Sequence, residues 1–182
     1  MIDVQRNSPS LRLGEAFLGD EGCSVVGKYL EEHDTFSVID LHGNNITGAG
    51  IINLCKYLSK TEALKEYLFV HIIHRFSLEW NSLGQSAQGL EMLCGALGEN
   101  KSITNVDLRN NKIGGNAYMY LSNLIRMNNT LQVLDLRWNE LGTEGAKGLI
   151  AALEKNRSLT QLELSGNKIT EEVLNIIGIS FD

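Results

Sequence analysis

The sequence predicts a horseshoe-shaped α/β solenoid, a single domain over residues 1–182 with parallel strands on its concave side and helices on its convex side. Two observations lead to this prediction. An eleven-residue template, L-x-x-L-x-L-x-x-N-x-L, recurs along the chain and is complete from Leu131 to Leu141. Self-similarity at a fixed period indicates a stack of units instead of a globule with one centre. The template also returns after about 28 residues, which leaves room for a full helix behind each strand.

The ninth template position measures the period. It is occupied by Ala16, Asn44, Asn81, Asn111, Asn139 and Asn167, at steps of 28, 37, 30, 28 and 28 residues. The units therefore lie near residues 8–35, 36–72, 73–102, 103–130, 131–158 and 159–182. Ala16 has no amide, which suits an N-terminal capping unit with no neighbour below it.

Each unit begins with a short strand. Positions 4 and 6 of the template, such as Leu134 and Leu136, point into the core, while the residues between them point outwards. The asparagine closes the turn after the strand, because its amide can pair with backbone groups that the bend leaves free. We therefore expect a buried ladder formed by Asn44, Asn81, Asn111, Asn139 and Asn167.

The second half of each unit reads as a helix. In the fifth unit, Thr143 is the expected N-cap and Glu144 lies in the first turn, where the helix dipole favours an acid. The following apolar residues share one face at helical spacing, namely Ala146, Leu149, Ile150 and Leu153. Equivalent helices are expected at 19–33, 48–60, 87–100 and 114–128, with a shorter one at 170–179.

The composition limits the function. A net charge of -6 argues against a nucleic-acid surface and against an anionic membrane surface, since both require basic patches. The longest apolar stretch, 67–73, is too short to span a bilayer, and the N-terminus lacks the apolar core of a signal peptide. Cys23, Cys55 and Cys94 have no metal spacing and are expected to be small core residues. A cytoplasmic protein is the expectation.

A strand, an asparagine turn and a helix in 28 residues resemble the ribonuclease-inhibitor class of leucine-rich repeats over roughly residues 8–178. Most members of that class bind other proteins. Within it, the segments Ser77–Gly84, Val106–Asn111 and Leu134–Asn139 are most similar to the repeat head of a centrosomal leucine-rich-repeat linker protein. That resemblance implies an organising scaffold of the cytoskeleton, at the centrosome or ciliary basal body. The linker family carries a coiled coil after its head, and this chain has no sustained heptads, so it is either a shorter relative or a part of a longer protein.

The 37-residue step contains an insert of nine residues, Tyr67–Arg75, which falls in frame within a strand. Two interpretations remain open. In one, Ile73–Arg75 replaces Leu64–Glu66 at the start of the strand. In the other, the nine residues are a short intron retained in the gene model.

The outward strand positions form columns across the sheet. Asp107 and Asp135 fall in one column and Arg109 and Arg137 in the next, so we expect a cross-strand lattice of charges about 4.8 Å apart. The lattice either relieves like-charge repulsion on an exposed sheet or opens to meet the charges of a partner.

Both tryptophans of the chain, Trp80 and Trp138, occupy the eighth position, two strands apart. Each indole either packs over the next turn or serves as a binding hot spot, for which Trp and Arg are the commonest residues. The candidate partner-binding residues of the concave face are Trp80, Trp138, Arg109, Arg137, Asp107, Asp135, Glu79 and His42.

These features predict a non-catalytic scaffold that binds a protein partner and has no cofactor, metal or small-molecule substrate. The sequence contains no phosphate loop, nucleophile elbow or HExxH, and the pair His71 and His74 lacks further ligands for a metal. The alternative is a GTPase-activating or other regulatory protein of the Ran-activator type, in which Arg109 or Arg137 would act on the nucleotide.

Overall fold

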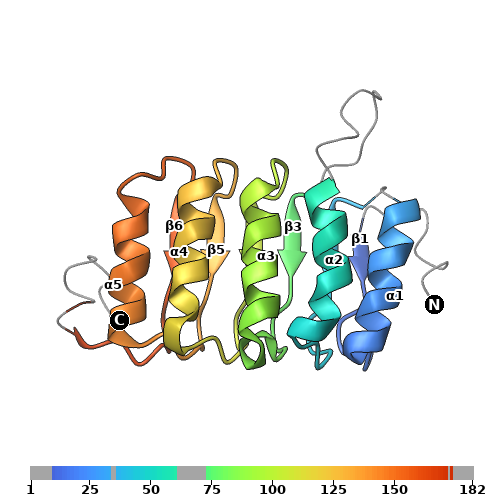
Figure 1. The fold of residues 1–182 in the computed structure, drawn as a ribbon, viewed down its shortest axis with the longest axis horizontal. Helices are drawn as coiled ribbons and strands as arrows, with labels where there is room; N and C mark the ends of the chain where they lie inside the picture. The colour runs from blue at the N-terminus through green and yellow to red at the C-terminus, as the bar shows by residue number, and fades with distance from the viewer. Residues whose placement is uncertain (1–9, 34–35, 61–72, 172, 174–182) are drawn as a thin grey trace.

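Six parallel strands form one open sheet in chain order (Figure 1). The computed structural model describes residues 10–33, 36–60, 73–171 and 173. The strands are β1 (Ser10–Arg12), β2 (Val38–Asp40), β3 (Arg75–Ser77), β4 (Asn105–Asp107), β5 (Val133–Asp135) and β6 (Gln161–Glu163). The helices are α1 (Gly19–Glu32), α2 (Gly48–Lys60), α3 (Ala87–Glu99), α4 (Tyr118–Met127) and α5 (Gly142–Leu153), with two 3-10 helices, η2 (Leu83–Gln85) and η3 (Gly115–Ala117).

The five helices lie side by side on one face of the sheet, and each packs on the next (Figure 1). No helix of the described residues covers the opposite face, and β1 and β6 lie at the two ends of the stack. The predicted α/β solenoid of parallel strands and helices is confirmed.

Each residue of a strand pairs with the residue at the same template position in the next strand. Arg12 pairs with Asp40, and Asp107 pairs with Asp135. The register also holds between β2 and β3, where Val38 pairs with Arg75. Ile73 is buried there, so the structure places Ile73 to Arg75 at the start of the strand, as the first interpretation of the insert expects. Residues 67–72 of the insert lie outside the described residues.

The template asparagines lie buried at the turns after the strands, and each bridges two units. Asn139 donates from Nδ2 to Leu108 O at 2.9 Å and to Leu136 O at 3.0 Å. Its Oδ1 accepts hydrogen bonds from the backbone nitrogens of Asn111 at 2.9 Å and Ile113 at 3.0 Å. One side chain therefore satisfies backbone groups of its own turn and of the preceding turn, none of which can reach water.

A second asparagine ladder lies at the other edge, where the helices return to the strands. It consists of Asn100, Asn128 and Asn156, which are 28 residues apart. Asn128 Nδ2 donates to Leu97 O and Asn100 O, while its Oδ1 accepts from the backbone nitrogen of Leu131 at 2.7 Å. Our sequence analysis missed this ladder, although the equal spacing of the three residues signals it.

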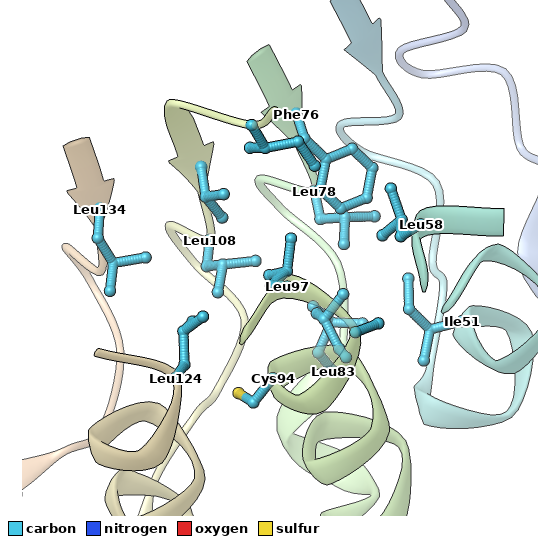
Figure 2. Close-up of a cluster of buried hydrophobic side chains, with 14 of the residues drawn as sticks. Ile51, Leu58, Phe76, Leu78, Leu83, Cys94, Leu97, Leu108, Leu124 and Leu134 are labelled. Carbon is cyan, nitrogen blue, oxygen red and sulfur yellow. The ribbon is translucent and has the colours of Figure 1, made fainter. Parts of the chain in front are cut away.

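The core is a continuous apolar layer between the helices and the sheet (Figure 2). Leu78, Leu108 and Leu134 contribute from the strand side, and Leu97 and Leu124 from the helices. Every unit buries several such residues against its neighbours, and each contributes about 1.5–3 kcal/mol. The stack is therefore stable as a whole instead of unit by unit.

The three cysteines are buried and free, as expected of small core residues. Burial is the main cause that raises the pKa of the Cys23 and Cys55 thiols to about 12, and it also raises the pKa of Cys94. These thiols therefore carry no thiolate near neutral pH.

Two details of the predicted helices differ, and a third prediction is not tested. Thr143 is not the N-cap of α5, because the helix already begins at Gly142, whose nitrogen is held by Asn167 O at 2.9 Å. Thr143 Oγ1 instead accepts a hydrogen bond from Thr170 N. The helix expected at 114–128 starts with the 3-10 turn η3 before α4 begins at Tyr118. The helix expected at 170–179 lies largely outside the described residues.

We predict that Asn139→Leu lowers the free energy of unfolding by at least about 3 kcal/mol, because two buried N–H groups and two carbonyls lose their partner. Equilibrium unfolding in urea measures this change. Asn123→Leu is the matched control, because Asn123 is exposed on α4, and it should change the value by less than about 0.5 kcal/mol. Equal effects of the two substitutions would contradict the structural role of the ladder.

Candidate partner-binding surface

The open face of the sheet, called the concave face below, displays the outward strand positions in aligned columns. The fifth template position contributes Arg12, Asp40, Ser77, Asp107, Asp135 and Glu163, which are register partners from β1 to β6. The seventh position contributes Gly14, His42, Glu79, Arg109, Arg137 and Ser165.

The three aspartates of the fifth position hold the backbone at the ends of β2, β4 and β5. Asp107 Oδ1 accepts a hydrogen bond from the Arg109 nitrogen at 3.1 Å, and Asp135 Oδ1 accepts one from the Arg137 nitrogen at 3.1 Å. Asp40 holds the His42 nitrogen in the same way at 3.2 Å. Each of these aspartates therefore stabilises the backbone of its own strand end, a role that was not predicted from the sequence. The recurring spacing of an acid two residues before a base is the signal of this role.

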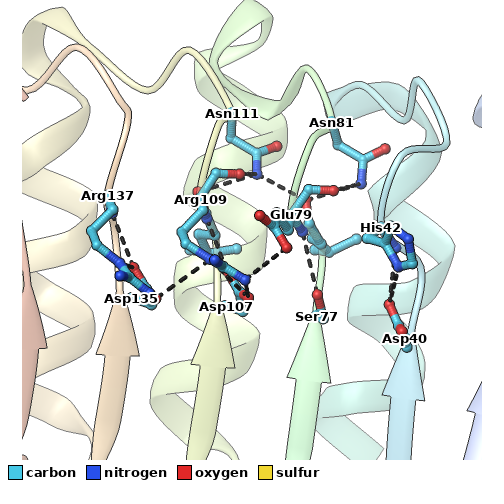
Figure 3. A network of polar contacts seen from close by, with 12 residues as sticks. Asp40, His42, Ser77, Glu79, Asn81, Asp107, Arg109, Asn111, Asp135 and Arg137 are labelled. Carbon is cyan, nitrogen blue, oxygen red and sulfur yellow. Dashed lines mark hydrogen bonds and ion pairs between the residues drawn. The ribbon is translucent and has the colours of Figure 1, made fainter. Parts of the chain in front are cut away.

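Arg109 is the centre of the charge network on the concave face (Figure 3). Its Nη2 lies 2.7 Å from Asp107 Oδ2 and 2.7 Å from Glu79 Oε2. Its Nε lies 3.4 Å from Asp135 Oδ2 on the next strand. The hydrogen bonds to Asp107 are the main cause that raises the pKa of Arg109, so the guanidinium stays charged. Three carboxylates from three strands thus share one cation.

Arg137 continues the network by one strand. Its Nη2 lies 2.6 Å from Asp135 Oδ2, and this hydrogen-bonded pair raises the pKa of the guanidinium. Its side chain is 38% exposed, against 29% for Arg109, so Arg137 is the more accessible cation.

Glu79 is less exposed than either arginine, at 20% of its side chain. Burial is the largest cause that raises the pKa of Glu79, and the charge of Asp107 adds to it. Arg109 opposes both effects. The network therefore depends on this arginine to keep the carboxylates charged so close together.

His42 forms a separate pair with Asp40. Its Nδ1 lies 2.8 Å from Asp40 Oδ1, and this hydrogen bond raises the pKa of the imidazole. The ring covers Gly14 of the first unit, because a side chain at Gly14 would collide with it. The absence of a side chain at Gly14 thus makes room for His42.

The eighth template position has a left-handed backbone in all six units. Trp80 has a φ of 55° and Trp138 a φ of 58°, like Gly43 and Gly166 in the same column. Bulky residues rarely adopt this conformation, which costs about 1–2 kcal/mol for a residue with a Cβ atom. Our sequence analysis missed this strain, although two glycines in the column signal it.

Both indoles are largely exposed, at 63% for Trp80 and 62% for Trp138. Trp138 also lies over the next unit, because a Cβ atom at Gly166 would be 2.6 Å from its Cε3. The two interpretations of the tryptophans therefore coexist at Trp138, which packs on the next turn and still offers a face to solvent.

Two hollows lie beside the charged columns and the tryptophans. One, of about 360 Å³, lies on the concave face and is lined by Asp40, Asp107 and Asp135 together with outward residues of the third template position. Those third-position residues are Val38, Arg75, Asn105 and Val133. They were not predicted from the sequence, although they alternate with the inward residues of the fourth position along each strand. The other, of about 440 Å³, runs along the turns between Trp80 and Trp138.

The predicted patch thus divides into separate groups. Arg109, Arg137, Asp107, Asp135 and Glu79 share one network, whereas His42 pairs with Asp40. The two tryptophans line the turn edge.

The described residues offer neither a metal site nor a membrane-spanning helix. Within the described part of the chain, no three His, Cys, Asp or Glu side chains gather as a metal site requires. None of the helices in the described ranges combines the length and apolar character needed to cross a bilayer.

We predict that Trp80→Gly leaves the protein more stable than Trp80→Ala by about 1 kcal/mol, because glycine relieves the left-handed backbone. Urea unfolding of the two variants measures the difference. The same pair at Val25, which is exposed within α1, is the control and should give the reverse order, since alanine favours a helix. A more stable alanine variant at position 80 would contradict the strain.

We predict that the imidazole of His42 titrates above its ordinary value of about 6.5 and that Asp40→Asn lowers its midpoint. Because the folded pKa is raised, the stabilisation by protonated His42 is complete below the ordinary pKa and is lost as the pH rises through the folded pKa. NMR titration of the ring protons measures the midpoint in both proteins. The same midpoint in both would contradict the pairing.

Comparison with known proteins agrees with this architecture. The family described as Leucine Rich repeat matches residues 35–55, 128–149 and 155–172. The chain is also 33% identical over 101 residues to leucine-rich repeat-containing protein 45 of Gallus gallus, an alignment that covers 56% of this chain and 14% of that protein. The chain thus matches a small part of the length of this relative. Three segments of the chain thus match leucine-rich repeats, and part of the chain is similar to leucine-rich repeat-containing protein 45.

Proposed function

We propose that the protein is a non-catalytic scaffold that binds a partner protein through its concave face. The observation that carries this proposal is the asymmetry of the sheet, whose one face is covered by helices while the other presents aligned charged columns to solvent. A folded protein that leaves one face of a sheet open and charged has a broad surface for another chain.

The concave face suits a protein better than a small molecule. Its hollow of about 360 Å³ is lined by both charged and apolar residues, including Asp107, Asp135 and Val133. The exposed ends of Arg137 and His42, each 38% accessible, border the ion network. These groups can exchange their internal partners for charges of a docking protein, which favours specific recognition.

The charged residues are poorly placed for catalysis. The carboxylates of Glu79, Asp107 and Asp135 are held by arginines and not poised as an acid and a base. A GTPase-activating arginine must reach into a nucleotide site, whereas Arg109 is held by three carboxylates. The scaffold therefore accounts for the geometry better than the alternative of a Ran-type activator.

The proposed location is the cytoplasm, at the centrosome or the ciliary basal body. It follows from the resemblance of the repeats to the head of a centrosomal linker protein. The similarity to leucine-rich repeat-containing protein 45 supports a relation between the two repeat regions.

We predict that Arg137→Glu reduces the recovery of a native partner at least about tenfold, because a new acid beside Asp135 adds like-charge repulsion within the docking surface. Affinity capture from native cells, quantified for one partner that the wild-type chain retains, measures the effect. The matched control is Arg126→Glu, the same charge change at an exposed residue of α4. Circular dichroism verifies that both variants are folded.

Equal recovery with the two variants would contradict binding through the concave face. A tagged wild-type chain that is diffuse in cells and absent from purified centrioles would contradict the centrosomal location, whatever the result of the capture.

A further inference from the structure

We propose that the turn-edge groove binds an extended acidic segment of the partner protein, with two apolar side chains three residues apart resting on Trp80 and Trp138. The turn-edge groove is the hollow of about 440 Å³ whose lining includes Trp80, Ser82, Asn110, Lys112, Trp138 and Lys168. The inference rests on the proposed scaffold function and names the chemistry of one partner element.

The spacing of the two indoles is set by the sheet. The backbone nitrogens of Trp80, Asn110 and Trp138 donate to carbonyls of the following strand at 3.0, 3.1 and 2.9 Å. The strand ladder therefore continues through the eighth position, and two strand steps separate the tryptophans by about 10 Å. Three residues of a polyproline II segment advance about 9.3 Å. Side chains at positions i and i+3 of such a segment match the two indoles.

The indoles are suited to binding because both are largely accessible, and Trp138 also rests over Gly166. Each is more than 60% exposed although its backbone has a left-handed conformation that disfavours a bulky residue. The repeated turn imposes this conformation in all six units, so it fixes the direction in which each indole leaves the backbone. Aromatic-lined grooves are the usual receptors for polyproline-like segments.

The charges of the turn-edge groove differ from those of the concave face. Lys112 and Lys168 are both exposed, and neither forms an ion pair with another described residue. Glu140 is the acid of the groove lining, so the lining carries one surplus positive charge. By contrast, Arg109 and Arg137 are held by carboxylates. Acidic residues of the segment therefore find accessible cations at the turn edge.

The two tryptophans also provide a direct probe, because they are the only tryptophans in the sequence. Their intrinsic fluorescence reports occupation of the groove without any label. The test ligand is the synthetic peptide acetyl-EEPFEPFEE-amide, which carries two phenylalanines three residues apart between acids. Two control peptides replace both phenylalanines with alanine or all glutamates with lysine.

We predict a saturable change of emission with the acidic phenylalanine peptide and a Kd at least about tenfold weaker for each control peptide. Addition of salt should weaken binding of the acidic peptide, because the lysines are exposed. The double variant Lys112→Glu/Lys168→Glu should weaken it at least about tenfold. Lys28→Glu/Lys155→Glu is the matched control, since it makes the same change of net charge at exposed residues outside the groove and should stay within about twofold.

Absence of saturation up to about 1 mM peptide would overturn the inference, as would equal binding of the lysine peptide. Tighter binding of a thymidine oligonucleotide would also overturn it, because stacked bases with phosphates would then be the occupant. If the groove variant retains the native partner while Arg137→Glu loses it, the scaffold proposal stands and this inference fails. If Arg137→Glu retains the native partner while the groove variant loses it, binding through the concave face is contradicted and binding through the turn-edge groove is supported.

Discussion

The structure depends on the need to satisfy backbone groups buried at the two edges of the stack. At each edge the chain turns inside the protein, where water cannot reach the peptide groups. Asn139 pairs with four such groups on one edge, and Asn128 performs the same task on the other. Leucine would fill the same space but would leave these groups without partners. The two ladders therefore decide where the chain can turn, and the apolar layer between them supplies the stability.

Exact alignment of the strands follows from this constraint and creates the surface. Since the turns after β2 to β6 are all held by an asparagine, equivalent residues of neighbouring strands become neighbours in space. Arg109 can therefore reach Glu79, Asp107 and Asp135 in three neighbouring units. The same alignment places the two exposed indoles on one edge. Charge and aromatic groups that lie about 30 residues apart in sequence thus act together.

The sequence predicted the repeating elements well because one side-chain periodicity governs them. Strand positions, the asparagines after β2 to β6 and the core cysteines all follow from the template. Thr143 was assigned wrongly as a cap, because hydrogen bonds between units and not a local side chain start the helix. The left-handed backbone at Trp80 was missed because tryptophan gives no local indication of it. The columns across the sheet predict contacts between strands, so they do not predict the hydrogen bonds that Asp107 and Asp135 accept from backbone nitrogens two residues further along the chain.

The unbroken register between β2 and β3 has an evolutionary consequence. Val38 pairs with Arg75 although the two units are separated by a longer stretch of sequence than the others. Alignment is imposed by the turn at the end of each strand, so the length of the preceding connection is free to vary. Insertions and deletions between a helix and its following strand can therefore accumulate in descendants without displacing a column of outward residues, and such a protein can change in size while its sheet stays aligned.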